Sequence, residues 1–583
     1  MTTPPAEPKP RKKTKWYWHV VNSILFLWML GGVNVLLLQD IPLLLFLVVF
    51  IGLFCLSQWT ISRYKSRLIG TSIGLIFYFG GLAGMFALLV FIIPPFAISP
   101  QTTYLTEPRA KEFYGIDYQS VIEKELDPGV PTQDNGFRLL FETFGRSLCN
   151  DELYDQQWDH LCRYFDLSSE LEPKFTFVTW QSYSETFTSE EQEIVKTAYE
   201  QNNLPWSEEA MPLVRQWLDK NDAALDVFVA AIQKPVLYAP PMFDGTLLIE
   251  GKLLNELVCR GMAKDIQVRV HYRLSIGEID GAWDDVLAMY RLREHHRQSV
   301  WLLVSSLVNV GIAGMANLSA ESVLLHSDWT TDEILEKMAE IAPFLQPFSK
   351  EEISKILRYE RLAALDSLTH IANGTYDFTA WNSVQSPADT NSWEQFKKKA
   401  TMRFARLGIS MVKANLYYDE AEQRYFRGDS MENEERKTRD IYEYLSLLAW
   451  YGYFGGAIPV MIGEITTDLL GPATEAWRTS QVRFQTDISL NRLMFALEAY
   501  RRDHAGNYPV ALEDLRERYL AEIPLDPFSG EAFRYVLEEA GFLLYSVGPN
   551  GIDDEGRGYG DKPKGDDIRR RIPIAVPPTE PEA

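Results

Sequence analysis

Residues 490–509 read Leu-Asn-Arg-Leu-Met-Phe-Ala-Leu-Glu-Ala-Tyr-Arg-Arg-Asp-His-Ala-Gly-Asn-Tyr-Pro, and this stretch decides the fold of the C-terminal part of the chain. Its apolar residues recur with the period of an amphipathic helix as far as Tyr500. Gly506 and Pro509 then interrupt the pattern, as is typical where a helix ends and a turn begins. The stretch therefore predicts a helix that ends in a sharp turn.

Shorter phrases follow this helix in a fixed order. Leu512 and Leu515 begin a Leu-rich segment that leads to the phrase Pro-Leu-Asp-Pro at 524–527. Residues 533–537 and 541–545 have the composition of two short strands. The phrase Ser-Val-Gly-Pro-Asn-Gly at 546–551 opens an acidic loop, which ends in Asp-Asp-Ile at 566–568. Residues 480–570 are therefore expected to form a small α+β module.

The order of these phrases resembles the globular domain of the major pseudopilin of type II secretion. That family has the phrase Tyr-x-x-x-x-Gly-x-Tyr-Pro, where this chain has five residues between Tyr500 and Gly506. It also has Pro-x-Asp-Pro, a small hairpin and a Ser-x-Gly-Pro-Asp-Gly loop that ends in Asp-Asp-Ile. Pilin subunits begin at a processed N-terminus, whereas this module is internal. It therefore looks like a borrowed domain that is not processed and polymerised in the usual way.

The resemblance implies a calcium site, because the acidic C-terminal loop of the pseudopilin binds calcium. Hard cations prefer several oxygens from carboxylates and carbonyls on a flexible loop. Asn550 stands where the family has Asp, and the loop 552–565 is longer and carries three basic residues. A solvated acidic loop is the alternative. The expected ligands are Asp553, Asp554, Asp566, Asp567, Val547 and Asn550.

Three apolar runs precede the rest of the chain, at 16–38, 41–59 and 68–93. Each is near or above the roughly 20 residues that a helix needs to cross a bilayer. No run contains Asp, Glu, Lys or Arg, which disfavours an ion or proton path. Basic residues precede the first run and lie between the second and third, so the N-terminus is expected in the cytoplasm. Residues from about 99 onward then lie outside it.

The remaining segments give a mainly helical protein. Gly277-x-Ile279-x-x-Ala282 joins two helices expected at 251–275 and 279–297, and it resembles the turn of a tetratricopeptide repeat. It occurs once, so an ordinary helical hairpin is the alternative. Four phrases carry a second resemblance: Val-Arg-Gln-Trp at 214–217, Asn-Asp-Ala-Ala-Leu at 221–225, Tyr-Ala-Pro-Pro at 238–241 and the segment 277–283. With them, residues 205–345 resemble uncharacterised planctomycete membrane proteins. The expected segments are a cytoplasmic tail (1–15), a three-helix anchor (16–98), a mixed α/β segment (99–180), a helical domain (181–443), an apolar helix and connector (444–479), the module (480–570) and a disordered tail (571–583).

Two local features leave alternatives open, and two other segments have a single expected structure. The uncharged run 444–463 is either a fourth span or a buried helix, while 300–315 is expected to be a core helix. Cys149 and Cys162 either pair or remain free and buried. The alternating residues 175–180 predict a strand.

Composition and motifs restrict the function. The chain has 583 residues and a net charge of −23, which argues against a broad nucleic-acid surface. Nucleotide-binding, zinc-protease and serine-hydrolase motifs are absent from the sequence. His295 and His296 are expected at the surface or at a helix C-terminus, and Glu360 with Arg361 as a solvated or structural charge set.

The sequence therefore predicts a mainly α protein with three N-terminal transmembrane helices, a helical extracytoplasmic body and a pseudopilin-like module. We expect an integral protein of the bacterial cytoplasmic membrane that binds protein partners in the envelope as a scaffold rather than as an enzyme. An accessory role in a secretion or pilus-like assembly is a fold-level analogy. An envelope hydrolase without a linear motif, or a sensor of calcium or a peptide, are the alternatives.

Overall fold

The computed structural model describes residues 80, 96–149, 155–200, 206–243, 247–251, 253–373, 375, 407–427, 457–539 and 541–572. The three apolar runs expected to span the membrane lie outside these residues, apart from residue 80. The apolar run 444–463 lies outside them as far as residue 456.

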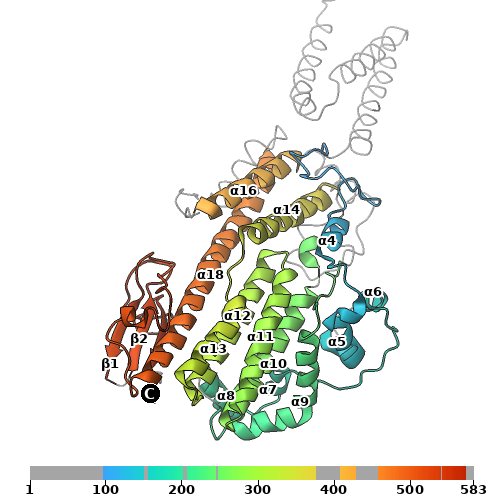
Figure 1. Cartoon of the computed structure of the whole chain (residues 1–583). Coiled ribbons are helices and arrows are strands. Elements are labelled where there is room, and N and C mark those ends of the chain that lie inside the picture. Colours follow the sequence, from blue (N-terminus) through green and yellow to red (C-terminus); the bar gives the residue numbers. More distant parts are fainter. Residues whose placement is uncertain are drawn as a thin grey trace, which may run out of the picture. The chain divides into compact units, whose positions relative to one another are not determined.

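Helices account for 62% of the described residues, and one three-stranded antiparallel sheet lies near the C-terminus. The prediction of a mainly helical chain with a small α+β region is therefore confirmed at this level. The helices are α4 (Tyr118–Leu126), α5 (Gly136–Phe144), α6 (Asp155–Phe165), α7 (Trp180–Ser184), α8 (Ser189–Glu200), α9 (Met211–Ile232), α10 (Leu254–Ser275), α11 (Ile279–Gln298), α12 (Leu303–His326), α13 (Thr331–Ile341), α14 (Lys350–Asn373), α16 (Leu407–Arg427) and α18 (Ala457–Asp503), as in Figure 1.

The chain divides into two compact units that interleave along the sequence. One unit comprises residues 1–117, 364–419 and 434–469, and the other comprises residues 118–363, 420–433 and 470–583. Helices α14 and α18 each contribute to both. The second unit holds the helical body and the C-terminal sheet, and it is the unit that positions the site described below.

The centre of the second unit is a bundle of α10, α11 and α12, each of which contacts the other two (Figure 1). Between α10 and α11 the chain turns at Gly277, whose φ of 80° favours glycine. The Arg273 guanidinium closes the turn by donating to the Gly281 carbonyl oxygen over 2.8 Å. Ala282 is fully buried at the crossing. The predicted helical hairpin is therefore confirmed.

A buried arginine ties the hairpin to α9. Arg269 on α10 donates two hydrogen bonds, of 2.9 and 2.7 Å, to the two carboxylate oxygens of Asp285 on α11. Its remaining nitrogen donates to Asp222 and Asp226 on α9, over 3.1 and 2.8 Å. Both Arg269 and Asp285 are 2% exposed. A bidentate pair of this kind fixes the relative position of the three helices.

Helix α12 is the one helix among the described residues that is long and apolar enough to cross a membrane. Slightly more than half of its apolar stretch, 56%, is buried against neighbouring elements. Its N-terminus is capped from α14, because the Glu360 carboxylate accepts the Leu303 N–H over 3.1 Å. These contacts support the prediction of a core helix at 300–315.

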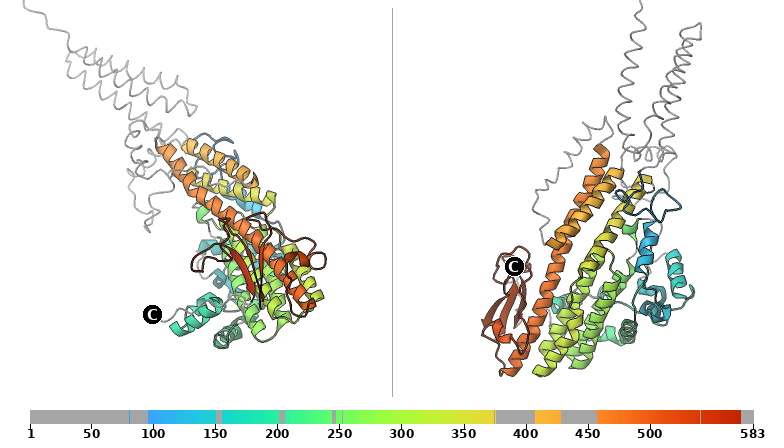
Figure 2. Two further views of the ribbon diagram at one scale, coloured as in Figure 1. Left: turned by 90° about the vertical axis from the view of Figure 1, so that its left-hand side faces the viewer. Right: turned by 45° about the horizontal axis from the view of Figure 1, so that its top comes forward.

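The sheet has the order β1 (Arg534–Glu538), β2 (Gly541–Ser546), β3 (Ile568–Ile572). Arg534 pairs with Tyr545, and Ser546 pairs with Ile568. The first two strands match the predicted hairpin, whereas β3 was not predicted. The sheet lies beside the C-terminal half of α18 (Figure 2).

The helix of the module is longer than the sequence suggested. Helix α18 runs without interruption from Ala457 to Asp503, so the boundary expected at residue 480 lies inside it. From Phe484 onward its apolar residues belong to the same core as α10 to α13 and the sheet residues Phe542 and Leu544. The rings of Phe495 and Trp283 on α11 lie 6.3 Å apart. The module and the helical body therefore share one core.

The mixed α/β assignment of residues 99–180 is wrong for the described part of that segment, which contains helices and no named strand. Residues 175–179 run extended, but side chains rather than a neighbouring strand satisfy their backbone. The Asn221 side chain accepts the Val178 N–H over 3.1 Å, and the Trp217 indole donates to the Val178 carbonyl oxygen over 2.8 Å. The alternating pattern reflects packing against helices.

Candidate metal centre

The acidic loop predicted to bind a cation connects β2 to β3 and comprises residues 547–567. Two glycines allow it to fold back on itself. Gly548 has a φ of 67°, and a side chain there would collide with the Asp566 carbonyl oxygen. A side chain at Gly565 would collide with the Arg557 carbonyl oxygen. The loop is therefore compact enough to bring carboxylates from its two ends together.

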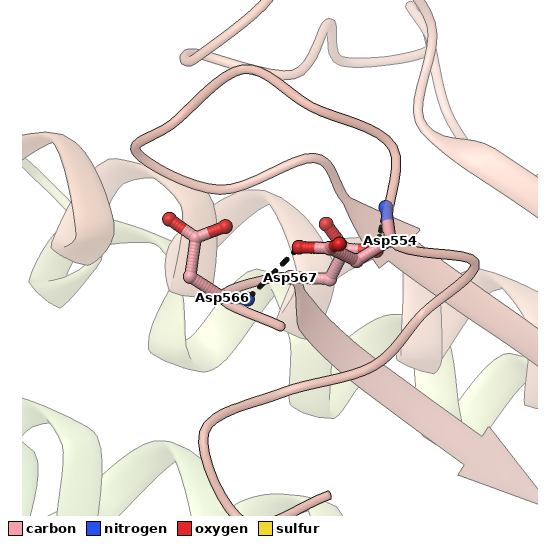
Figure 3. Close-up of side chains that lie close together, drawn as sticks. All are labelled: Asp554, Asp566 and Asp567. Carbon is pink, nitrogen blue, oxygen red and sulfur yellow. Dashed lines mark hydrogen bonds between the residues drawn. The ribbon is translucent and has the colours of Figure 1, made fainter. Parts of the chain in front are cut away.

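Asp554, Asp566 and Asp567 meet within this loop (Figure 3), and each offers a carboxylate oxygen within 4.8 Å of the others. Asp566 is 9% exposed and Asp567 is 5% exposed. Three carboxylates at such separations repel one another unless a proton or a cation compensates them. The cluster therefore has the geometry and the charge of a cation site.

Backbone N–H groups hold one oxygen of each carboxylate. Asp566 accepts from the Asn550 N–H over 3.0 Å, and Asp567 accepts from the N–H groups of Asp554 and Gly556 over 3.1 and 2.8 Å. Asp554 accepts from the Asp566 N–H over 3.2 Å. The Oδ1 atoms of Asp566 and Asp567 are buried and have no hydrogen-bond partner among the described residues. A buried oxygen without a partner is costly, and a bound cation would satisfy both.

The electrostatics of the loop agree with this geometry. Burial, together with the charges of Asp554 and Asp553, raises the pKa of the Asp567 carboxyl to about 6, although two backbone N–H groups oppose the shift. Arg557 is the nearest basic group, with a nitrogen 3.7 Å from Asp554. A divalent cation would favour the ionised form of all three carboxylates.

The structure corrects the predicted ligand set. Asp553 lies outside the cluster, because its carboxylate accepts the Tyr545 hydroxyl over 3.0 Å and lies 3.5 Å from Arg534. Asn550 contributes its N–H to Asp566, while its side-chain oxygen accepts the Ile552 N–H over 2.6 Å. Val547 donates its N–H to Asp526 over 3.3 Å, and its carbonyl oxygen stays a predicted ligand. Only the aspartates at 554, 566 and 567 remain as carboxylate ligands.

Asp526 holds the acidic loop in place, and it was not predicted to do so although it lies in the phrase at 524–527. It is 1% exposed and accepts from the Ser546 hydroxyl over 2.7 Å and from the Val547 N–H over 3.3 Å. It also accepts from the Phe528 N–H and the Ser529 hydroxyl, both over 3.0 Å. Asp526 therefore fixes the base of the acidic loop.

The histidine pair lies in the last turn of α11, which is the predicted helix C-terminus, but it is not at the surface. His296 is fully buried, with Nδ1 3.3 Å from the Asn309 side chain, and burial lowers its pKa to about 3. The His295 ring lies 2.9 Å from the Ile232 carbonyl oxygen. The two rings have different partners, so they do not form one metal face. The carboxylate of Glu360 has a structural role as the cap of α12.

A cavity of about 650 Å³ lies among α4, α6 and the loop at 241–243. Its described lining contains no serine, threonine or cysteine to act as a nucleophile. The lining residues are Glu123, Asp155, Gln156, Gln157, His160, Arg163, Pro241, Met242 and Phe243. Cys149, Cys162 and Cys259 are buried elsewhere, and no disulfide joins Cys149 to Cys162.

Comparison of the chain with protein-family models, curated proteins and solved structures gives no match. The resemblances to the pseudopilin domain and to planctomycete membrane proteins therefore stay predictions from the sequence phrases. The geometry of the acidic loop is the observation that bears most directly on function.

Proposed function

We propose that this protein is a membrane-anchored scaffold of the bacterial cell envelope whose C-terminal module binds calcium. The observation that carries the calcium assignment is the pair of unpartnered, nearly buried oxygens on Asp566 and Asp567 beside Asp554. Calcium accepts six to eight oxygens in flexible geometry, so three carboxylates with water or carbonyl oxygens suit it better than the strict octahedron of magnesium.

The scaffold assignment is supported by the way the chain is built. The module shares a core with the helical body, so it presents a fixed surface rather than a mobile appendage. The three apolar runs at 16–93 would anchor this body, with the N-terminus in the cytoplasm and the body outside. A role in a secretion or pilus-like assembly follows only from the pseudopilin resemblance.

Calcium titration of the detergent-solubilised full-length chain by isothermal calorimetry tests the site. The double variant Asp566→Asn with Asp567→Asn is expected to lose binding. Asp553→Asn removes a carboxylate from the same loop but outside the cluster, so it is the matched control and should bind like the wild type. Equal loss in both variants would mean that general loop charge, and not the cluster, holds the ion.

Partner capture from native membranes tests the scaffold assignment. The full-length chain, crosslinked in the membrane, is expected to recover a defined set of envelope proteins in calcium, and fewer in chelator. Recovery of abundant lipoproteins alone, unchanged by chelator, would contradict the proposal.

A further inference from the structure

The cation cluster is continuous with the strand that follows it. Asp566 and Asp567 come directly before β3, and their own N–H groups donate to Asp554 over 3.2 Å and to the Arg557 carbonyl oxygen over 3.0 Å. The position of the two carboxylates and the start of β3 are therefore set by the same few backbone atoms. A displacement at the cluster is transmitted to the strand.

Strand β3 is attached to the helical body through a buried arginine. The Arg570 side chain is 12% exposed and donates to Glu321 on α12 over 2.7 Å. Its second nitrogen donates to Asp487 on α18 over 3.3 Å. Glu321 is fully buried, and the Asn491 side chain lies 3.5 Å from it. The strength of a charge-assisted hydrogen bond depends steeply on its geometry. The Arg570–Glu321 bond is therefore sensitive to the position of β3.

The next residue along the strand provides a contrast. Arg571 pairs with Glu538 on β1 over 2.9 Å, and both side chains are partly exposed. Solvent-exposed ion pairs contribute little to stability. Two adjacent arginines on one short strand thus differ in what they hold: Arg570 holds the strand to the body, and Arg571 lies at the surface of the sheet.

We infer that occupation of the Asp554–Asp566–Asp567 site and the Arg570–Glu321 contact are coupled, so that the bound cation secures the sheet to α12. This inference rests on the proposed calcium binding. Without a cation the three carboxylates lower their repulsion by moving apart, and the backbone at 566–567 moves with them. That movement shifts β3 and lengthens the contact at Arg570. Arg570 and Glu321 are therefore positioning residues for a cation that they do not touch.

Coupling is reciprocal, so loss of the contact must weaken cation binding by the same factor by which the cation strengthens the contact. Arg570→Gln and Glu321→Gln are each expected to weaken calcium affinity by roughly 5- to 20-fold, which lies within the usual range of coupling between sites. Arg571→Gln, the matched control, is expected to change it less than about 2-fold. The double variant of Arg570 and Glu321 should lose no more than the larger single effect.

Calorimetry on the full-length chain measures these affinities, and hydrogen exchange provides the second readout. Calcium should slow exchange in α12 around Glu321 in the wild type, but not in Asp566→Asn with Asp567→Asn. If Arg570→Gln does not fold, the calcium affinity of Arg570→Lys and hydrogen exchange in the wild type still test whether the site and the contact are coupled. Calcium binding with equal affinity in the Arg570 and Arg571 variants, together with unchanged exchange in α12, would overturn the coupling alone. No calcium binding by the wild type would instead overturn the proposed function.

Discussion

Replacing Asp265 by asparagine is expected to stabilise the protein at pH 8 and to destabilise it at pH 4. Asp265 lies on α10, is 2% exposed, and accepts the Trp180 N–H over 2.9 Å through one oxygen. Its other oxygen is buried without a hydrogen-bond partner among the described residues. Burial raises the pKa of this carboxyl from 3.8 to about 7, against the effects of Trp180 and Lys264.

The sign of the pH effect follows from this shift. Between pH 3.8 and 7 the unfolded chain releases the proton while the folded chain retains it, so stability falls as the pH rises through this window. A difference of about 3 pKa units at about 1.4 kcal/mol each corresponds to about 4 kcal/mol at pH 8. The new amide N–H₂ lacks a partner and costs about 1–3 kcal/mol. The expected net gain at pH 8 is therefore about 1–3 kcal/mol, whereas at pH 4 only the amide cost remains and the variant is expected to be about 1–3 kcal/mol less stable than the wild type.

Thermal unfolding followed by tryptophan fluorescence measures this effect, because Trp180, Trp206 and Trp217 surround the site. A gain of about 2 kcal/mol corresponds to a rise of roughly 2–3 °C in the melting temperature at pH 8 for a unit of this size. Asp284→Asn, at an exposed position on α11, is the control and should leave the melting temperature unchanged. A shift of equal size and sign at pH 4 and pH 8 would refute the reasoning, because a charge-independent change in packing would then explain it.

Three other substitutions or measurements have definite expectations. Gly548→Ala should abolish calcium binding and lower the melting temperature, because the new side chain would collide with Asp566. Gly551 has the same φ of 67° but open space around it, so the control Gly551→Ala should incur backbone strain of only about 1 kcal/mol. Equal effects of the two variants in calorimetry would argue against the compact loop. Arg269→Met should cost about 3–5 kcal/mol by leaving Asp285 buried without its main partner, and a denaturation midpoint like that of the wild type would contradict this. Cys149 and Cys162 should both react with a thiol reagent after unfolding in the absence of reductant, and protection of both would reveal a disulfide.

The helices could be predicted from the sequence because their signals are local. The apolar period and the Gly277 turn are enough to place α10 and α11, and the uncharged run from residue 300 is enough to identify α12 as a core helix. Strand β3 was missed because three consecutive arginines do not resemble a strand. Its burial depends on Glu321, which lies 249 residues away in sequence. No local pattern contains that information.

The sequence predicted that aspartates of the acidic loop form the candidate site, but not which of them lie together. Asp553 and Asp554 are neighbours with the same chemistry, so the sequence gives no reason to choose between them. The choice is made by the Tyr545 hydroxyl, which engages Asp553, and by the Asp566 N–H, which holds Asp554 in the cluster. These contacts cross from one strand or loop end to another and appear only in the folded chain.

The most direct test of the calcium assignment is the melting temperature of the full-length chain in calcium and in chelator. A ligand at 100 times its dissociation constant stabilises the folded state by about 2.7 kcal/mol. We expect a clear rise in calcium for the wild type and for Asp553→Asn, and no rise for Asp566→Asn with Asp567→Asn. A wild-type melting temperature that does not respond to calcium would contradict the account.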